Sequence, residues 1–222
     1  MVETKIIILD QQEIVYKIHY KRIKNCYLRV EKGEVVIRCS PLFPQSEIEK
    51  LIRNHQEEIL EQIKGYVPKY NYQEDGYVYL FNQKYQIILK DMNIKKCAIH
   101  DRQIYVYSKN IQTTIEMFLK QELMHYLKEK IDFYLSTSFH HPLPEIQIKK
   151  MKRRWGACFY QKNRVCFNLV LAHIDYALID YVIVHELCHF LEANHSKAFY
   201  HEIEKRMPDY KERERLLKDV GI

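Results

Sequence analysis

The sequence is short of glycine and has no paired cysteines, and each shortage removes a class of protein. Only five glycines occur among 222 residues, at positions 33, 65, 76, 156 and 221. No two of them lie closer than eleven residues. The chain therefore contains neither a GxGxxG dinucleotide-binding loop nor a GxxxxGK phosphate-binding loop. The six cysteines form no CxxC pair, which leaves a zinc ribbon of four cysteines unsupported.

Long apolar runs are also missing. Near the N-terminus the longest run is the four residues Ile6–Leu9, which is too short for the core of a signal peptide. No run approaches the roughly eighteen apolar residues of a membrane helix. With 47% hydrophobic and 29% charged residues, the chain can still bury a sizeable core, as one large domain or two small ones. We therefore expect a cytoplasmic protein outside the membrane, with reduced and mostly buried thiols and an oligomeric state that the sequence does not define.

Charge is nearly balanced along the chain. The formal net charge of +6 permits acidic partners but does not require nucleic acid. One local cluster stands out, formed by Lys149, Lys150, Lys152, Arg153 and Arg154. It could bind phosphates, or it could be the solvated edge of a strand, so a nucleic-acid partner stays open.

The pattern of apolar residues predicts an α+β fold. Residues 1–110 are β-rich, with a hairpin turn at Glu31–Glu34 and one helix. That helix begins at Ser46, which forms a capping-box pattern with Glu49, and its apolar spacing continues to Ile63.

Residues 111–222 are richer in helix. A long helix is expected from Thr113 to about residue 136, then strands at 145–151 and 164–171, and finally two further helices. No internal repeat is recognisable. We therefore predict two parts, 1–110 and 111–222, which could share one core.

Residues 176–191 form an apolar segment that carries a small group of polar side chains. Asp175 is a suitable N-cap for a helix here. At about 100° per residue, His189 lies about 40° from His185 around the helix axis, and Glu186 lies about 100° from it. Leaving such groups unpaired in a core is costly. A zinc ion resolves the cost, because two histidines four residues apart can bind it with the intervening glutamate beside the site.

A third histidine follows at a spacing that a continuous helix would not allow. His195 comes six residues after His189, so the chain must turn before it. We expect the bend at Glu192–Asn194, with Asn194 in the left-handed conformation. Three histidines and a water make an open, catalytic type of zinc site. The sequence therefore predicts one Zn²⁺ per chain; a metal-free cluster of buried histidine and glutamate is the alternative.

These residues also resemble a known family. His185–Phe199 resembles the HELxHxxxxNHSxxF signature of the YgjP-like family, which is related to the SprT-type zinc metallopeptidases. Three further segments agree: Arg154–Cys158 with its RWGSC, Cys166–Leu169 with its INLN-type strand, and Met207–Tyr210 with its MPDY-like segment. The sequence departs from the pattern at Ala157, usually serine, and Cys188, usually alanine, neither at a liganding position. The histidine spacing also matches the metzincins, but Glu192 replaces their glycine, so we do not assign the chain to that clan.

The resemblance implies a zincin-like helical part with a small sheet, following the β-rich N-terminal part. It further implies a zinc metallopeptidase with His185, His189 and His195 as ligands. Glu186 would be the catalytic residue, taking a proton from water and returning it to the leaving amine. The resemblance does not carry a substrate with it. A peptide or protein substrate is our own expectation, and an extended peptide could pair with the strand around Cys166–Leu169.

Several secondary assignments stay open. Five residues are candidates for contact with the substrate or the oxyanion, although each could be structural instead: Arg154, Trp155, Asn168, Tyr200 and His201. Three carboxylates could replace or support the third metal ligand: Glu202, Glu204 and Asp209. Two other function classes also fit the chain, namely a nucleic-acid-associated binding protein with a mainly structural zinc and a hydrolase of non-peptide amides.

Overall fold

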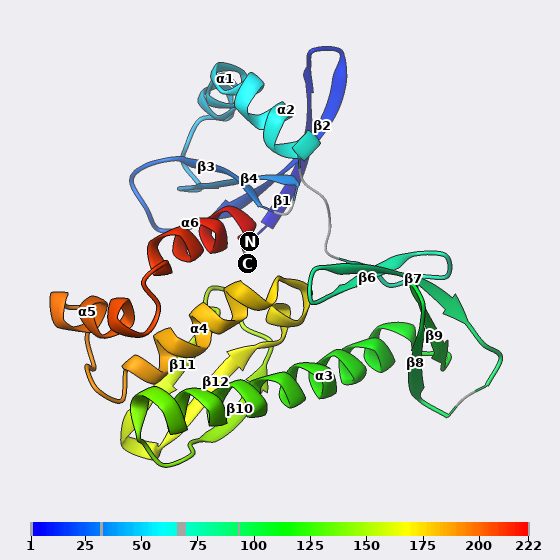
Figure 1. Cartoon of the computed structure of the whole chain (residues 1–222). Coiled ribbons are helices and arrows are strands. Elements are labelled where there is room, and N and C mark those ends of the chain that lie inside the picture. Colours follow the sequence, from blue (N-terminus) through cyan, green and yellow to red (C-terminus); the bar gives the residue numbers. More distant parts are fainter. Residues whose placement is uncertain (1, 32, 66–69, 93, 222) are drawn as a thin grey trace. The chain divides into compact units, whose positions relative to one another are not determined.

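Residues Met1–Pro68 and Lys69–Ile222 form two separate folded units. The computed structural model describes residues 2–31, 33–65, 70–92 and 94–221 (Figure 1). Its mixture of strands and helices confirms the predicted α+β class. The sequence placed a boundary near residue 110, which lies inside the second unit, between a strand ending at Tyr107 and a helix beginning at Ile111.

The first unit is a four-stranded sheet with two helices. Its strands are β1 (Val2–Leu9), β2 (Gln12–Tyr20), β3 (Tyr27–Glu31) and β4 (Glu34–Cys39). Their order is β1-β2-β4-β3, with β2 and β4 parallel and the other neighbours antiparallel. The helices α1 (Gln45–Asn54) and α2 (Gln56–Gly65) share one core with this sheet. The largest fully buried side chains of that core are Leu9, Tyr16, Ile18, Ile37, Ile48, Ile52 and Ile59.

Two details of the first unit differ from the expectations. The single helix predicted from Ser46 is two helices, because the first ends at Asn54 and the second begins at Gln56. The capping box is wrong, because the helix begins at Gln45, directly after Pro44, and no side chain caps it. Ser46 therefore lies inside the first turn. The predicted hairpin turn is present as the pair Glu31↔Glu34, while Lys32 within it lies outside the described residues.

The second unit contains two sheets and the remaining helices. The first sheet is built from β5 (Tyr70–Asn71), β6 (Tyr77–Leu80), β7 (Gln83–Leu89), β8 (Lys96–His100) and β9 (Gln103–Tyr107) in the order β5-β6-β7-β9-β8. The second is built from β10 (Glu145–Lys149), β11 (Gly156–Phe159) and β12 (Arg164–Asn168). The helices are α3 (Ile111–Tyr134), α4 (Tyr176–Cys188), α5 (Lys197–Arg206) and α6 (Tyr210–Val220). Short turns of other helix types cover Leu135–Phe139, Tyr160–Lys162 and Leu169–His173.

One strand topology occurs twice in the chain. In both β1–β4 and β6–β9 a hairpin is followed by a second hairpin, whose last strand pairs in parallel with the second strand of the first. Leu9 pairs with Gln12, and Leu80 pairs with Gln83. Tyr16 lies seven residues after Leu9, and Ile87 lies seven residues after Leu80. They form matching parallel pairs, Tyr16 with Val35 and Ile87 with Ile104.

The second hairpins are also in the same register. Val35 pairs with Val30, and Ile104 pairs with Ile99. The chain thus contains a repeated strand topology without a recognisable repeat in its sequence. The sequence hides the repeat because a strand needs only an inward side chain at alternate positions, and residues as different as Tyr16 and Ile87 both meet that need.

The long helix α3 supports the second unit. Asn110 caps it by accepting a hydrogen bond from the backbone N–H of Thr113 at 3.2 Å. Its buried residues recur at helical spacing and are Thr114, Ile115, Leu119, Leu123, Leu127 and Ile131. The helix begins slightly earlier than predicted, and a π-helical turn at Leu135–Phe139 continues it. Among the described residues, no helix combines the length and the apolar character needed to cross a membrane.

The three-stranded sheet positions the site. Its order is β10-β12-β11, with β10 parallel and β11 antiparallel to β12. The strands predicted at 145–151 and 164–171 correspond to β10 and β12, whereas β11 was not expected. Because β12 is central, only β10 and β11 have a free edge.

The turn between β1 and β2 gives a direct test of the local structure. Asp10 and Gln11 both have positive φ, 47° and 62°. This conformation costs a residue with a side chain about 1–2 kcal/mol, whereas the greater unfolded-state freedom of glycine costs about 0.5–1 kcal/mol. Gln11→Gly should therefore raise the free energy of unfolding by about 0.5 kcal/mol in urea denaturation. Gln12→Gly, within the extended β2, should lower it instead; destabilisation of equal size in both would contradict the turn.

Candidate metal centre

The helix α4 carries the predicted metal-binding motif. Asp175 caps its N-terminus, accepting a hydrogen bond from the backbone N–H of Ala177 at 2.8 Å, as the sequence predicted. Most of α4 is buried, including Ile179, Val184 and Leu187. Besides Glu186, the helix carries one acidic residue, Asp180, which accepts a hydrogen bond from the Tyr126 hydroxyl on α3 at 2.6 Å. Asp180 is therefore occupied by α3 and takes no part in the histidine group.

The three predicted ligands come together. One nitrogen each from His185, His189 and His195 can be chosen so that all three atoms lie within 4.8 Å of one another. The Nε2 atoms of His185 and His195 are 3.0 Å apart. In the described part of the chain this is the one group of three or more histidine, cysteine or carboxylate side chains with metal-binding geometry. The sequence spacing and the folded geometry agree on the same three residues.

The bend that brings in His195 differs from the expectation in one respect. The α-helix ends at Cys188, and a further turn follows, with the N–H of Glu192 bonded to the carbonyl of Cys188. The chain then bends at residues 193–194. Asn194 is not among the described residues with positive φ, so the expected left-handed conformation is absent. Ser196 then caps α5 by accepting a hydrogen bond from the N–H of Phe199.

Phe199 forms a common packing surface for the three imidazoles. Its side chain is fully buried. The distances from its ring centre to those of His185, His189 and His195 are 5.0, 4.6 and 4.7 Å. The first turn of α5 begins two residues after His195 and so restrains its backbone. Phe199, in the same turn, packs against all three imidazole rings. The sequence signal was present, because Phe199 is the last residue of the matched signature, but spacing alone assigned it no function.

Hydrogen bonding and burial favour neutral imidazoles. His189 Nδ1 lies 3.2 Å from the carbonyl oxygen of Glu192, and an N–H at this position leaves Nε2 with a free lone pair. Burial lowers the pKa of His189. Burial also lowers the pKa of His185 to about 3, and the neighbouring His189 and His195 contribute further. The His185 Nδ1 atom is buried and has no hydrogen-bond partner among the described residues.

This donor set fits a zinc ion. Neutral imidazole nitrogens are preferred zinc ligands. The Nε2 atoms of His185 and His195 are within hydrogen-bond distance, so a neutral Nε2–H on one ring can donate to the other. Burial disfavours the doubly protonated, charged form of His185. A zinc ion would replace the shared proton and accept a lone pair from each ring.

Glu186 is buried beside the histidines and held by the edge strand β11. Its exposed fraction is 6%. A hydrogen bond links it to the backbone of Cys158. A Cβ atom on Gly156 would lie only 2.5 Å from Glu186 Oε1 and 2.7 Å from its Cγ. Gly156 is therefore the residue type that lets the strand backbone approach the carboxylate.

The environment of Glu186 favours its protonated form in the absence of a cation. Burial raises the pKa of Glu186 to about 8, while the Cys158 hydrogen bond and the Arg154 charge offset part of the shift. A dication on the neighbouring imidazoles would favour the carboxylate. Metal binding and ionisation of Glu186 are thus coupled.

A cavity of about 630 Å³ opens over these groups. It is bounded by three elements of the second unit: β11 with the residues before it, α4, and the C-terminal helix α6. Tyr181 and Val182 of α4 and Leu217 of α6 give it an apolar wall. Glu214 and Lys218, also on α6, form an ion pair of 3.1 Å at the same cavity. The contribution of α6 was not predicted, because nothing in its sequence links it to the histidines.

The five candidate contact residues occupy different places. Arg154 and Trp155 line the cavity. Tyr200 packs beside His195 and Tyr210, with ring centres 6.3 and 6.1 Å away. His201 is exposed and is not part of the cavity wall.

Asn168 lies beneath the loop that leads into β11. It is fully buried. Its amide donates to the carbonyls of Met151 and Arg154, and its oxygen accepts from the N–H groups of Met151 and Val170. Its hydrogen-bonding capacity is therefore spent on fixing residues 151–154, which carry Arg154 to the cavity.

The proposed strand for substrate pairing needs a correction. The sequence suggested the segment Cys166–Leu169, but β12 is bonded to β10 on one side and β11 on the other. It therefore offers no edge for another chain. The free edge beside the cavity belongs to β11, which also holds Glu186.

Two of the three carboxylates that could replace or support a metal ligand form ion pairs elsewhere, and the third is exposed. Glu202 pairs with Arg206 and Lys205, both at 2.6 Å. Asp209 pairs with Arg213 at 2.8 Å, and Glu204 is exposed. The support for His189 is instead the backbone carbonyl of Glu192, which sequence patterns do not reveal.

The basic cluster lies at the end of β10 and in the loop before β11. Lys150 pairs with Glu116 of α3 at 2.6 Å. Lys152, Arg153 and Arg154 are exposed, and no ion pair to them occurs within the described residues. Free positive charge is thus concentrated at the start of β11.

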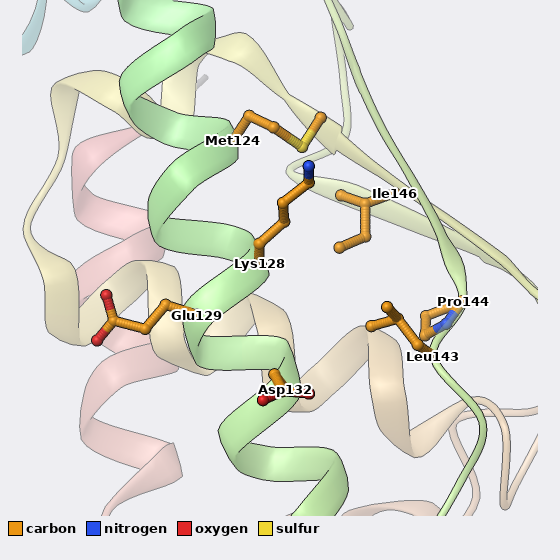
Figure 2. A pocket seen from close by; sticks show the side chains of 7 residues that line it. All are labelled: Met124, Lys128, Glu129, Asp132, Leu143, Pro144 and Ile146. Atoms are coloured by element: carbon orange, nitrogen blue, oxygen red, sulfur yellow. The ribbon is translucent and has the colours of Figure 1, made fainter.

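A second cavity, of about 600 Å³, lies between α3 and the chain leading into β10 (Figure 2). Met124 and Lys128 of α3 face Ile146 across it, and Leu143 and Pro144 close one end. Its wall contains no histidine or cysteine, and its carboxylates are Glu129 and Asp132. Of these two cavities, only the one over α4 is lined by the histidine group.

Converging imidazoles beside a buried glutamate, in a cavity bordered by an edge strand, are typical of metal-dependent peptidases. Comparison with known proteins agrees. Residues 24–220 match the YgjP-like metallopeptidase domain, so the chain belongs to the YgjP-like metallopeptidase family. The match includes most of both units. The resemblance inferred from the sequence is thereby confirmed.

Two solved structures are also similar over part of the chain. The metallopeptidase zymogen abylysin of Pyrococcus abyssi is 17% identical, with a TM-score of 0.39, over 42% of this chain and 94% of abylysin. The metallopeptidase zymogen jannalysin of Methanocaldococcus jannaschii is 25% identical, with a TM-score of 0.40, over 43% of this chain and 90% of jannalysin. No protein with a curated description matches the chain.

The metal centre can be tested by its stoichiometry. After removal of metal and reloading, the wild-type protein should retain about one equivalent of zinc. His189→Ala should retain much less, because the remaining two imidazoles hold the ion weakly. His201→Ala, an exposed histidine away from the cavity, is the matched control and should behave as wild type. Elemental analysis after gel filtration measures all three; full zinc content in His189→Ala would refute the site.

Proposed function

We propose that this chain is a zinc-dependent peptidase in which His185, His189 and His195 bind one zinc ion and Glu186 is the general base. The main support is the convergence of three imidazoles beside one buried carboxylate in a single cavity. Membership of a metallopeptidase family supports the same reaction class.

The ion and the protein have separate tasks in this proposal. Bound zinc would supply a Lewis acid that acidifies water and polarises a carbonyl group. The three imidazoles would hold it, with Phe199 and the Glu192 carbonyl keeping their rings in place. Because only three protein ligands are present, one coordination position is left for the reaction.

Glu186 would move the proton. Its carboxylate takes a proton from the attacking water and delivers it to the leaving amine. The Cys158 hydrogen bond and the close approach of Gly156 restrict where this carboxylate can lie. A fixed Glu186 carboxylate favours catalysis, because proton transfer requires it to stay within hydrogen-bond distance of the attacking water and the leaving amine.

The substrate would be an extended peptide lying along β11. This strand has a free edge at the cavity, and an added strand would bind it by backbone hydrogen bonds without a requirement for particular side chains. Arg154 and Trp155 precede the strand and line the cavity, so they are the proposed substrate contacts. The apolar wall of Tyr181 and Leu217 would receive an apolar side chain of that peptide.

Replacement of the general base separates chemistry from metal binding. Glu186→Gln should reduce turnover of an unstructured peptide mixture by at least about 100-fold, because the amide cannot accept the proton. Zinc content should stay at that of the wild type. Glu192→Gln is the matched control, since only the backbone of Glu192 contributes to the site. Mass spectrometry of the cleavage products measures turnover, and undiminished cleavage by Glu186→Gln would exclude this function for it.

Gly156 gives an independent test of the positioning of Glu186. A methyl group at this position displaces the carboxylate, so Gly156→Ala should lower turnover by about tenfold or more while zinc remains bound. The same change introduced into Glu186→Gln should have little further effect on turnover, because the group it displaces no longer acts. Equal losses in both backgrounds would show that Gly156 acts elsewhere.

Nucleic-acid binding is the alternative that a specific observation favours. Lys152, Arg153 and Arg154 are exposed and unpaired within the described residues, as a phosphate-binding surface requires. DNA binding through them would weaken steeply with salt and survive Glu186→Gln. Peptide cleavage would instead depend little on salt and would be lost in Glu186→Gln. Hydrolysis of a non-peptide amide would use the same metal site and is distinguished only by the substrate cleaved.

A further inference from the structure

Two cysteines of the first unit lie opposite each other at one end of the β3–β4 hairpin. The antiparallel register pairs Tyr27 with Arg38 and Leu28 with Ile37. Continued by one residue, it places Cys26 opposite Cys39. Opposed residues in antiparallel strands have Cα atoms about 4.5 or 5.5 Å apart. Both values fall within the separation of about 4.4–6.8 Å that a disulfide spans.

Both thiols also lie on the same face of the sheet. Cys39 belongs to the buried core of the first unit with Val35 and Ile37, and Cys26 packs against that core with Leu28 and Val30. The two thiols are hydrogen-bonded to each other. The shared face and the contact between the two thiols therefore agree with the strand register, which places Cys26 opposite Cys39. Neither cysteine is in a disulfide.

The repeated topology shows that the fold does not require thiols here. In the second copy of the strand motif, the positions equivalent to Cys26 and Cys39 are Lys95 and Ser108, by the matched pairs Val30↔Val35 and Ile99↔Ile104. A lysine and a serine therefore occupy the matching positions, although Lys95, unlike Cys26, has a positive φ of 53°.

A second pair of cysteines provides an internal comparison. Cys158 and Cys166 lie on the neighbouring strands β11 and β12, but Cys158 pairs with Val165 and Cys166 pairs with Ala157. The two are one residue out of register, so their side chains point to opposite faces of the sheet. The cysteines of both pairs are therefore close in the fold. Of these two pairs, only Cys26 and Cys39 have side chains on the same face of the sheet, as a disulfide requires.

We propose that Cys26 and Cys39 are a site of reversible oxidation, at which a small-molecule disulfide converts the two thiols into a cross-strand disulfide. Cys26 is partly exposed and Cys39 is fully buried, so the reagent reaches Cys26 first. The Cys26 thiolate attacks the reagent, releasing one thiol and forming a mixed disulfide. The Cys39 thiolate then attacks the Cys26 sulfur and releases the second reagent thiol. Two electrons and two protons pass from the protein to the reagent.

The reaction is slow at neutral pH and accelerates with alkali. Burial, with a contribution from Cys39, raises the pKa of the Cys26 thiol to about 11. The thiolate fraction, and with it the rate of attack, therefore rises about tenfold for each pH unit below that value. This behaviour suits a lasting cross-link better than a rapid sensor.

Glutathione disulfide is the reagent for the test. The full-length protein is incubated with it at pH 8.5–9 (about two units below the Cys26 pKa) and then digested without reduction. The expected major product lacks two hydrogen atoms and yields one linked peptide pair, containing Cys26 and Cys39. Free thiols counted after denaturation fall from six to four, that is, six less the two joined.

Variants and alternative products decide the outcome. Cys26→Ser and Cys39→Ser should each abolish the linked peptide, and Cys97→Ser, a half-buried thiol outside the pair, should leave it unchanged. If a variant fails to fold, the peptide map of the wild-type protein alone still decides the question. A glutathione adduct that accumulates on Cys26 without closure, or a Cys158–Cys166 link formed as readily, would overturn the proposal.

Discussion

The burial of Glu186 and the partial burial of His185 and His189, at the C-terminal end of α4, are the constraint to which the surroundings respond. His185 and Glu186 are removed from most solvent, so each neighbouring element must compensate. β11 supplies an N–H to Glu186, α5 brings Phe199 beneath the rings, and the turn after α4 supplies the Glu192 carbonyl to His189. These contacts hold the three imidazoles so that one nitrogen of each could bind the same divalent cation.

The small sheet connects this constraint to the proposed reaction. Asn168 fixes the loop before β11 from below, and that loop presents Arg154 to the cavity. β11 then passes Glu186 so closely that glycine is required at position 156. The same strand keeps one edge free beside the cavity. One short strand therefore both positions the proposed general base and offers a backbone surface to a peptide.

The candidate metal ligands could be predicted from the sequence, whereas many of the contacts that hold them in place could not. His185, His189 and His195 were found because helical spacing puts two of them on one face and a bend returns the third. The Glu192 carbonyl, the Cys158 N–H and the closeness of Gly156 are backbone features, which residue types do not encode individually. Leu217 of α6 reaches the cavity only through tertiary packing.

The fold shows the same division. Alternation and helical spacing located most strands and helices, including the cap at Asp175. The four-residue β11 was too short to give a periodic signal, and Pro44 moved the start of α1 away from the expected Ser46 cap. The repeated strand topology was invisible because its two copies share register but few residues, as Tyr16 and Ile87 illustrate.

The most direct test of the metal centre is X-ray absorption spectroscopy at the zinc edge of protein loaded with one equivalent of zinc. Zinc bound by His185, His189 and His195 should give a first shell of nitrogen and oxygen atoms at about 2.0–2.1 Å, with the outer-shell scattering of three imidazole rings. A sulfur shell at about 2.3 Å would indicate cysteine ligation and contradict it. A shell without imidazole scattering would contradict it equally.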